Sequence, residues 1–322
     1  MTERANAAPV HPRPTSDAVE VTLESLAGTD ARWAVLHGED ALARGHTDSD
    51  IDLVVDRNPL SLYAELVPRL MSNGLHPIGV VVYDIGAAAL FLLEADLGGR
   101  VQLDLMHDPL GHGRLGLRTA PLLEFAIDGT RWPRVSATDS RLYQAAKRVW
   151  KQDLESLSRL AAEIRPEEMS RYRYRARTVF ATPQRAACVI EALEHRRLPR
   201  FTQTFEHRLL SLRRYLTRMG KPVGHWIHID DSDESVGAVI HKALYHALPY
   251  VGAGQLGAGW GSRLAALARI AYKRRKPALI VSTGRLTGPF RPDFVLAAED
   301  ATPQAVVRAM ESRTLSLLGL SN

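Results

Sequence analysis

The chain has 322 residues, of which 45% are hydrophobic, and it carries a formal net charge of +5 with a pI near 9.4. This is enough apolar material for more than one core, while the single cysteine, Cys188, excludes an internal disulfide framework and a thiolate zinc cluster within one chain. The positive charge favours anionic partners such as nucleotides, nucleic acids or acidic sugars, and it does not bear on the fold.

The apolar residues are spread through the chain rather than gathered in long runs. No run approaches the roughly 18 apolar residues that a membrane-spanning helix needs, and residues 1–20 lack the apolar centre of a signal peptide. We therefore expect a cytoplasmic protein without a membrane partner. Residues 1–20 also mix Pro, Ala, Asn, Arg and Thr without periodicity, so we expect them to form a disordered arm.

A small α/β domain is predicted between residues 21 and 135. It begins with a short apolar run that starts at Trp33 and ends before Gly38, as a buried strand ending in a turn would. Farther along, apolar residues recur at helical spacing, and Gly74 stands where a left-handed helix cap belongs. The expected strands are residues 33–37, 51–55, 79–83, 89–94 and 101–106, and the expected helices are residues 40–43 and 60–71.

The rest of the chain is predicted to form a helical region over residues 136–219 and a second small α/β domain over residues 220–322. An apolar stripe between residues 142 and 150, with basic residues on the other faces, indicates an amphipathic helix at the start of the helical region. In the second domain we expect strands at residues 225–229, 278–282 and 294–298, helices at residues 235–248, 263–272 and from residue 303, and a glycine-rich loop at residues 251–261.

Two aspartates stand one residue apart at the start of the second predicted strand. In the sequence Asp50-Ile51-Asp52-Leu53 the side chains alternate across the strand, so the two carboxylates project from one face and the two apolar side chains from the other. Two adjacent carboxylates repel each other unless a cation lies between them. Mg²⁺ is the expected cation because it is hard and prefers oxygen ligands.

A third carboxylate is expected from the strand at residues 101–106. Asp104 lies between two leucines of this strand, so it points to the opposite face from them. Asp84 and Asp108 are alternatives for this role, but we favour Asp104 because an acid in the middle of an apolar strand needs an explanation. The expected metal ligands are therefore Asp50, Asp52 and Asp104.

This combination resembles the metal-binding core of nucleotidyltransferases of the DNA polymerase β superfamily. The superfamily pattern is a Gly followed by a small residue, then a spacer, then Asp-hydrophobic-Asp-hydrophobic, with a third acid on a later strand. Gly38, residues 50–53, the spacer between them and Asp104 all match this pattern. The likeness covers residues from about 33 to 105, which is less than a quarter of the chain.

The resemblance implies an α/β chain whose first domain has the α+β nucleotidyltransferase fold with a mixed sheet. It also implies in-line attack of an acceptor hydroxyl on the α-phosphate of a nucleoside triphosphate such as ATP, with Mg²⁺ or Mn²⁺ as the cofactor. Asp50 and Asp52 would share the metal ions. Asp104 would bind the first ion and accept the hydroxyl proton, so these three residues are the expected catalytic residues.

The nucleotide phosphates are expected near Gly38, whose lack of a side chain permits close approach of the backbone. Glu39 departs from the family pattern, which has a small residue there, and its carboxylate would repel phosphate unless it turns away. Lys147 and Lys151 are candidates for neutralising the triphosphate. Their alternative interpretation is that of ordinary exposed lysines on an amphipathic helix.

Three functions remain open at this point. The first is transfer of a nucleoside monophosphate to a small molecule or a sugar phosphate. The second is transfer to RNA or protein, which the arginine-rich residues 165–218 would support, although these arginines also fit a solvated helix face and nucleic acid is not the favoured partner. The third is a non-catalytic nucleotide-binding or scaffold protein, which Glu39 favours.

The chain also resembles uncharacterised nucleotidyltransferase-like proteins of bacterial polysaccharide clusters, some of which have a thymidylate-kinase-like domain at the C-terminus. Residues 99–108, residues 123–132 and the lysine-containing helix after them provide this likeness. The turn at residues 230–238 stands where a P-loop would, but it is acidic and has Val236 in place of the loop lysine. We expect a degenerate kinase-like domain, or an unrelated module that recognises an acceptor or partner.

Overall fold

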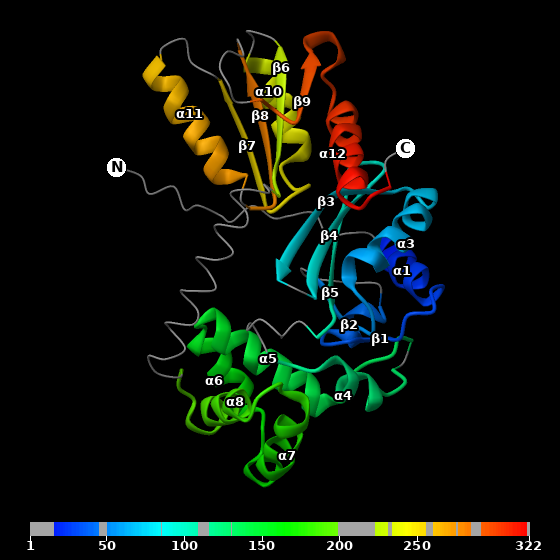
Figure 1. Ribbon diagram of the computed structural model, residues 1–322, viewed down its shortest axis with the longest axis vertical. Coiled ribbons are helices and arrows are strands. Elements are labelled where there is room, and N and C mark those ends of the chain that lie inside the picture. Colours follow the sequence, from blue (N-terminus) through cyan, green and yellow to red (C-terminus); the bar gives the residue numbers. More distant parts are fainter. Residues whose placement is uncertain are drawn as a thin grey trace.

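The protein has three parts along its long axis, which are a central α/β domain, a helical region on one side of it and a second α/β domain on the other (Figure 1). The α/β class predicted from the sequence is therefore confirmed. The computed structural model describes residues 16–44, 50–84, 86–108, 116–129, 131–198, 223–230, 234–255, 260–274, 276–284 and 291–320.

The central domain is built on a mixed five-stranded sheet in the order β1-β2-β5-β4-β3. Strands β2 and β5 run parallel, and the other neighbouring pairs are antiparallel. The strands are β1 (Trp33–Val35), β2 (Ile51–Val55), β3 (Leu75–Asp84), β4 (Ala87–Glu94) and β5 (Arg100–Met106), and the helices are α1 (Ser16–Ala27), α2 (Glu39–Leu42) and α3 (Pro59–Ser72).

One face of this sheet is apolar and is covered by α1 and α3. The alternate residues of β2, Ile51 and Leu53, point into this core together with the leucines of β5. Tyr63 of α3 ties the helix to the sheet, because its hydroxyl lies 2.6 Å from the carbonyl oxygen of Leu103 and accepts the N–H of Leu105 at 3.2 Å. The backbone on both sides of Asp104 is thereby held in place.

The other face of the sheet is divided between two neighbours. Near β1 and β2, Ala34 and Val54 pack against the helical region. Near β3 and β4, Val81 and Phe91 pack in a core shared with the second α/β domain. Between these two apolar areas the sheet presents aspartates, so both neighbouring parts of the chain border the same polar strip.

The helical region packs around the long helix α5, which begins after a capping serine. The Ser136 hydroxyl accepts the N–H of Asp139, and the buried carboxylate of Asp139 receives two hydrogen bonds of 2.8 Å from Arg175 of α7. This buried pair fixes the direction of α5 relative to its neighbours. The elements are α4 (Thr119–Glu124), α5 (Ala137–Lys151), α6 (Leu154–Ala162), η1 (Pro166–Glu168), α7 (Met169–Val179) and α8 (Pro183–His195).

The second α/β domain has a four-stranded sheet in the order β7-β8-β6-β9, in which all neighbouring strands are parallel. Helix α12 packs on β3 of the central sheet and, with β6 and β8, completes the shared core. The elements are β6 (His225–Asp230), α10 (Glu234–Leu244), β7 (Tyr250–Gln255), α11 (Trp260–Lys273), β8 (Ala278–Thr283), β9 (Phe294–Ala297), η2 (Ala298–Asp300) and α12 (Pro303–Leu317).

Two expectations from the sequence are wrong. Residues 16–20, assigned to a disordered arm, form the start of α1, whose Val19 is fully buried. Residues 250–255, assigned mainly to a glycine-rich loop, form strand β7, because its backbone pairs with β8 and needs no large side chains for that pairing. Helix α4 was not predicted, and α10 ends at Leu244 rather than at residue 248.

Other expectations fall on residues outside the described ranges. These are residues 1–15 of the expected arm, residues 199–219 of the expected helical region and residues 231–233 of the turn compared with a P-loop. Among the helices that are described, none combines the length and the apolar character needed to cross a bilayer.

Candidate active site

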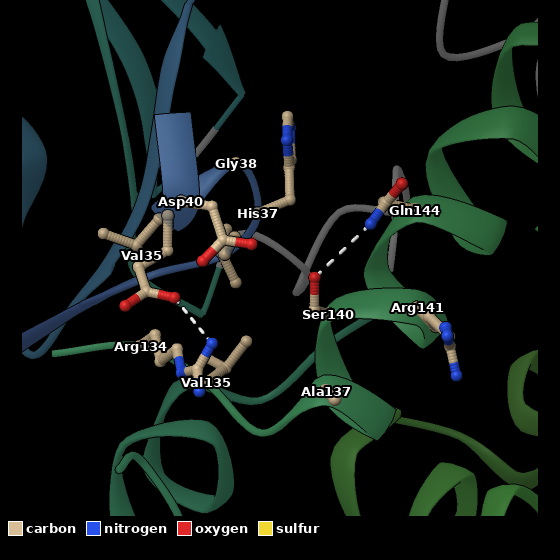
Figure 2. A pocket seen from close by; sticks show the side chains of 12 residues that line it. Val35, His37, Gly38, Asp40, Arg134, Val135, Ala137, Ser140, Arg141 and Gln144 are labelled. Atoms are coloured by element: carbon tan, nitrogen blue, oxygen red, sulfur yellow. Dashed lines mark hydrogen bonds and ion pairs between the residues drawn. The ribbon is translucent and has the colours of Figure 1, made fainter. Parts of the chain in front are cut away.

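The turn after β1 forms one wall of a cavity of about 230 Å³. Gly38, at the start of α2, has a φ of 79°, which favours glycine, and no atom lies within 4 Å of the position that a Cβ would take. The backbone therefore faces open space at this point. We call this space the Gly38 cavity, and it is lined by Val35, Leu36, His37, Gly38, Glu39, Asp40, Arg134, Val135, Ala137, Ser140, Arg141 and Gln144 (Figure 2).

Helix α5 forms the opposite wall of the Gly38 cavity. Ser140 and Gln144 are joined by a hydrogen bond of 3.4 Å and face the cavity, whereas Arg141 points away from it in Figure 2. Arg141 donates instead to the hydroxyl of Tyr172 at 3.1 Å. The polar groups available to a ligand from this wall are therefore a hydroxyl and an amide.

Glu39 is buried beside the cavity and paired with a cation. Its Oε2 atom accepts a hydrogen bond of 2.6 Å from Arg134, and only 6% of the side chain is exposed (Figure 2). The guanidinium offsets the negative charge that would otherwise repel a phosphate in the cavity. The departure of Glu39 from the superfamily pattern is therefore compensated by a residue 95 positions away in the sequence.

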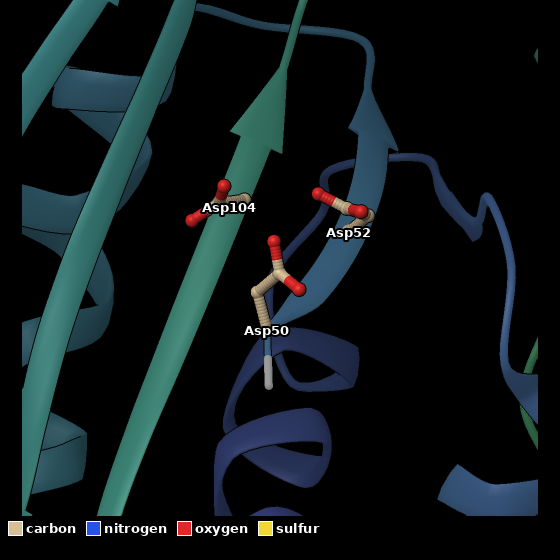
Figure 3. A group of neighbouring side chains, drawn as sticks. All are labelled: Asp50, Asp52 and Asp104. Atoms are coloured by element: carbon tan, nitrogen blue, oxygen red, sulfur yellow. The ribbon is translucent and has the colours of Figure 1, made fainter. Parts of the chain in front are cut away.

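The structure brings the three predicted carboxylates together (Figure 3). Asp52 of β2 stands directly opposite Asp104 of β5 in the parallel register, and Asp50 lies just before β2. One carboxylate oxygen from each residue lies within 4.8 Å of the other two. We call Asp50, Asp52 and Asp104 the aspartate triad.

Asp52 is the most strongly stabilised charge of the triad. Burial opposes its ionisation, but the hydrogen bond of 2.6 Å with His37 Nε2 and the charge of Lys147 outweigh burial and hold the pKa of Asp52 below its ordinary range. The Lys147 ammonium lies 2.5 Å from Oδ2 of Asp52 and 3.5 Å from Oδ2 of Asp50. The ammonium of Lys147 from α5 thus partly neutralises the triad, and His37 from the turn after β1 hydrogen-bonds to it.

Asp104 has the opposite environment. Burial and the charges of Asp52 and Asp50 raise the pKa of its carboxyl well above the ordinary value, although Gln102 donates a hydrogen bond of 2.9 Å to Oδ1. The pKa values of Asp52 and Asp104 are therefore shifted in opposite directions. The fold holds these two carboxyl groups close together although their negative charges repel each other.

The triad fits a hard divalent cation. Oδ1 of Asp52 is fully buried and has no hydrogen-bond partner among the described residues, so it has a lone pair to offer. Three carboxylates from two adjacent strands supply the oxygen ligands that Mg²⁺ and Mn²⁺ prefer. The residues therefore suit the metal that the sequence pattern implies.

Lys147 is part of the site rather than an ordinary surface lysine. Its side chain is only 18% exposed and lies over the ring of Tyr143, at 5.6 Å from the centroid. Burial disfavours the ammonium, but the charges of Asp52 and Asp50 outweigh this effect and raise the pKa of Lys147. Lys151, the other lysine considered from the sequence, is exposed at the end of α5.

Several residues of the site have no obvious signal in the sequence. Tyr143 is buried beneath His37, with the two rings stacked at 5.7 Å, and Gln102 holds Asp104. Ser140, Tyr143, Gln144 and Lys147 are spaced three and four residues apart, so the sequence indicates that they share one face of the helix. It does not indicate that this face borders the site. Of the alternative third acids, Asp108 accepts the N–H of Thr119 outside the triad, and the side chain of Asp84 is not among those described.

No protein-family model matches this chain, and no curated protein matches it. Among solved structures, the polymerase core of TRAMP, an RNA surveillance complex, matches with 13% identity over 56% of this chain and 56% of that chain, at a TM-score of 0.23. The match spans little more than half of the length of that protein. A likeness at this TM-score carries no argument, so the functional assignment rests on the site.

Proposed function

We propose that this protein is a Mg²⁺- or Mn²⁺-dependent nucleotidyltransferase that transfers a nucleoside monophosphate from a nucleoside triphosphate to a hydroxyl group of a small molecule or a sugar phosphate. The observation that carries the proposal is the aspartate triad, with its carboxylate oxygens within 4.8 Å of one another across β2 and β5. The Gly38 cavity beside it supports the proposal, because it offers backbone, hydroxyl and amide groups for a triphosphate.

The reaction forms a bond from the acceptor oxygen to the α-phosphorus and breaks the bond from that phosphorus to the bridging oxygen of the leaving pyrophosphate. Mg²⁺ or Mn²⁺ bound by the triad would stabilise charge on the entering and leaving oxygens. Asp104 would accept the hydroxyl proton. Lys147 and His37 keep Asp52 ionised and in place, and Gly38 leaves room for the phosphates at the turn.

We infer that the second α/β domain, over residues 220–322, contributes a wall of the site rather than a second phosphate site. Val236 of α10, which stands where a P-loop lysine would be, packs against the core shared with β3 and β4. An apolar residue at the position of the P-loop lysine cannot bind phosphate through a charge. This supports a role for the second α/β domain in recognising an acceptor or a partner. The remaining boundaries that we propose are residues 21–135 for the first domain and residues 136–219 for the helical region.

One surface favours a second candidate, transfer to RNA. Helix α7 exposes Arg171, Tyr174 and Arg177 along one stripe, and Tyr174 is 74% exposed. Neither arginine has an ion-pair partner within the described part of the chain. Exposed arginines that flank an exposed aromatic ring suit a nucleic-acid backbone and its bases. This candidate predicts RNA binding that weakens steeply with salt, whereas a small-molecule acceptor predicts none.

The test is incubation of the protein with each α-labelled nucleoside triphosphate, Mg²⁺ or Mn²⁺, and a cell extract as the source of acceptor. We expect label to move to an extract component with the wild type and not with Asp50→Asn or Asp52→Asn. Asp56→Asn is the matched control, because Asp56 follows the same strand and pairs with Arg32 instead of belonging to the triad. Transfer that persists unchanged in both triad variants contradicts the assignment.

A non-catalytic nucleotide-binding protein gives a different result in the same experiment. It would bind nucleotide tightly, with no transfer to any component under either metal. The ion pair of Glu39 with Arg134 argues against a non-catalytic protein. Glu39 is the departure from the superfamily pattern, and the ion pair means that it does not place an unpaired negative charge near the phosphates.

A further inference from the structure

The guanidinium of Arg100, at the start of β5, has a fully buried Nη1 atom, and no group in the described part of the chain accepts a hydrogen bond from this atom. The side chain as a whole is half-buried and lies over the ring of Phe91, at 5.9 Å from the centroid. A cation in such surroundings is costly unless an anion or water satisfies it.

Strand alternation places Arg100 on the same face of the sheet as Asp104. The two residues are four positions apart on β5, so their Cα atoms lie about 13 Å apart along the strand. Gln102 stands between them, opposite Phe91 in the register with β4, and its amide lies 3.4 Å from the hydroxyl of Tyr83. A row of polar groups therefore leads away from the triad toward the second α/β domain.

The charges near Arg100 form no direct ion pair with it in the described part of the chain, so its guanidinium can bind a ligand. Asp50 is near enough to stabilise the guanidinium, although burial has the larger effect and lowers the pKa of Arg100 overall. The carboxylate of Asp50 is itself 3.5 Å from the ammonium of Lys147. Arg100 thus stands at the edge of the acidic site with a charge that no contact within the described chain cancels.

In the sheet order β1-β2-β5-β4-β3, the Gly38 cavity borders the triad on the β1 side, and Tyr83 at the end of the row lies toward the β3 side. The cavity is built from the turn after β1 and from α5, whereas Arg100, Gln102 and Tyr83 come from β5 and β3. In-line displacement requires the attacking oxygen and the leaving group on opposite sides of the phosphorus atom. If the triphosphate occupies the Gly38 cavity, the acceptor approaches along the row.

We propose that Arg100, with Gln102 and Tyr83, forms the acceptor subsite, and that the acceptor bears an oxyanion at a distance from its reacting hydroxyl. This proposal rests on the proposed nucleotidyl transfer and specifies its substrate. The planar guanidinium suits a phosphate or carboxylate group through two parallel hydrogen bonds. Gln102 would then both hold Asp104 and contact the acceptor.

The test is calorimetric titration of the full chain with inorganic phosphate in the presence of Mg²⁺, with acetate as a second probe. We expect Arg100→Met to weaken phosphate binding at least tenfold. Arg100→Lys should weaken it less, because lysine retains the positive charge but cannot donate the two parallel hydrogen bonds of a guanidinium. Arg159→Met, at an exposed arginine of α6 that pairs with Glu155, is the control and should stay within twofold of the wild type. Stronger binding of phosphate than of acetate identifies a phosphorylated acceptor, and the reverse identifies a carboxylate.

Equal phosphate affinity in the wild type and Arg100→Met overturns the subsite, as does an absence of phosphate binding by the wild type. Binding that Gln144→Ala weakens and Arg100→Met does not would place the anion in the Gly38 cavity and also overturns it. If Arg100→Met fails to fold, the phosphate affinity of Arg100→Lys tests the subsite. A weaker affinity than that of the wild type supports it, and an equal affinity overturns it. Loss of binding in Arg100→Met, with no transfer by the wild type, contradicts the transfer and leaves the anion site standing.

Discussion

Each sheet of the molecule places two buried polar residues opposite each other on neighbouring parallel strands. In the central sheet the pair is Asp52 on β2 and Asp104 on β5, and in the second sheet it is His228 on β6 and Ser282 on β8. The Ser282 hydroxyl lies 3.0 Å from Nδ1 of His228 and accepts a bond of 2.8 Å from the indole of Trp226. The aspartates instead repel each other.

The difference lies in what each pair can satisfy with its own polar groups. A serine and a histidine have a donor and an acceptor between them, so Ser282 and His228 hydrogen-bond each other directly. Two carboxylates cannot do this, and the lone pair on Asp52 Oδ1 is left over even after Lys147 and His37 have been engaged. Such a pair is explained by a cation or substrate that is bound during function.

The largest effect is expected from a change in the central pair. Asp104→Asn should reduce transfer by on the order of 10³-fold or more, because it removes a metal ligand and the proton acceptor at once. Initial rates with labelled nucleotide measure this effect. Asp108→Asn, which retains the acceptor for the Thr119 N–H, should remain near the wild-type rate. Equal losses in the two variants would show that the position of the acid is unimportant.

Lys147→Met should reduce transfer by roughly 100-fold, because the charge that holds Asp52 and Asp50 is lost while the carboxylates remain. The same variant should unfold at a lower temperature without Mg²⁺ and recover part of the difference with it, which thermal melts can measure. Lys151→Met, one helical turn farther along α5, is the matched control. A normal rate in Lys147→Met would remove this lysine from the site.

The second sheet should respond through stability and pH rather than through catalysis. Burial and the charge of Arg313 lower the pKa of His225 to about 3, so the folded protein keeps this residue neutral where the unfolded chain, with an ordinary pKa near 6.5, binds a proton. The free energy of unfolding therefore falls as the pH drops from 6.5 toward 3. Between pH 7 and pH 5 this group should cost about 2 kcal/mol.

Urea unfolding of the wild type and His225→Gln at pH 7 and pH 5 measures this contribution, because glutamine has no proton to gain. The difference between the two pH values should be smaller in the variant. If both proteins lose the same free energy between pH 7 and pH 5, then His225 is not the group responsible.

The smallest effect is expected at the serine of the second sheet. Ser282→Ala should reduce the free energy of unfolding by about 1–2 kcal/mol, since the buried indole N–H of Trp226 then lacks its acceptor. Thr283→Val is the comparison, because the buried Thr283 hydroxyl has no hydrogen-bond partner within the described ranges and its removal should be neutral or slightly stabilising. Equal destabilisation by both changes would show that the network is irrelevant.

Much of the central sheet can be predicted from the sequence because its strands have regular apolar patterns. The aspartate triad can be anticipated for the same reason, since Asp50 and Asp52 follow the alternation of one strand and Asp104 interrupts the leucines of another. Strand β7 cannot be found this way, because the sequence Val251-Gly252-Ala253-Gly254 has too few large side chains to show any alternation. Only its pairing with β8 defines it as a strand.

The remaining parts of the site depend on contacts between distant segments. Glu39 is unfavourable for phosphate when considered with its sequence neighbours, and the position of Arg134 beside it is set by tertiary packing. Alternation along β5 already places Arg100 in line with Asp104, but no local feature of the sequence shows that this arginine is half-buried over Phe91. Lys147 has the same character, since a lysine on an amphipathic helix gives no indication of which element it faces.

The shared core between the two α/β domains limits how the gene can be divided. The face of the central sheet that presents Ile78, Val81, Phe91 and Leu93 is dry only because α12 and the second sheet cover it. A fragment that stops at residue 219 would expose this apolar face to solvent and would aggregate or bind chaperones. Engineered fusions, split reporters and swaps with other acceptor modules should therefore keep residues 223–320 attached to the central domain.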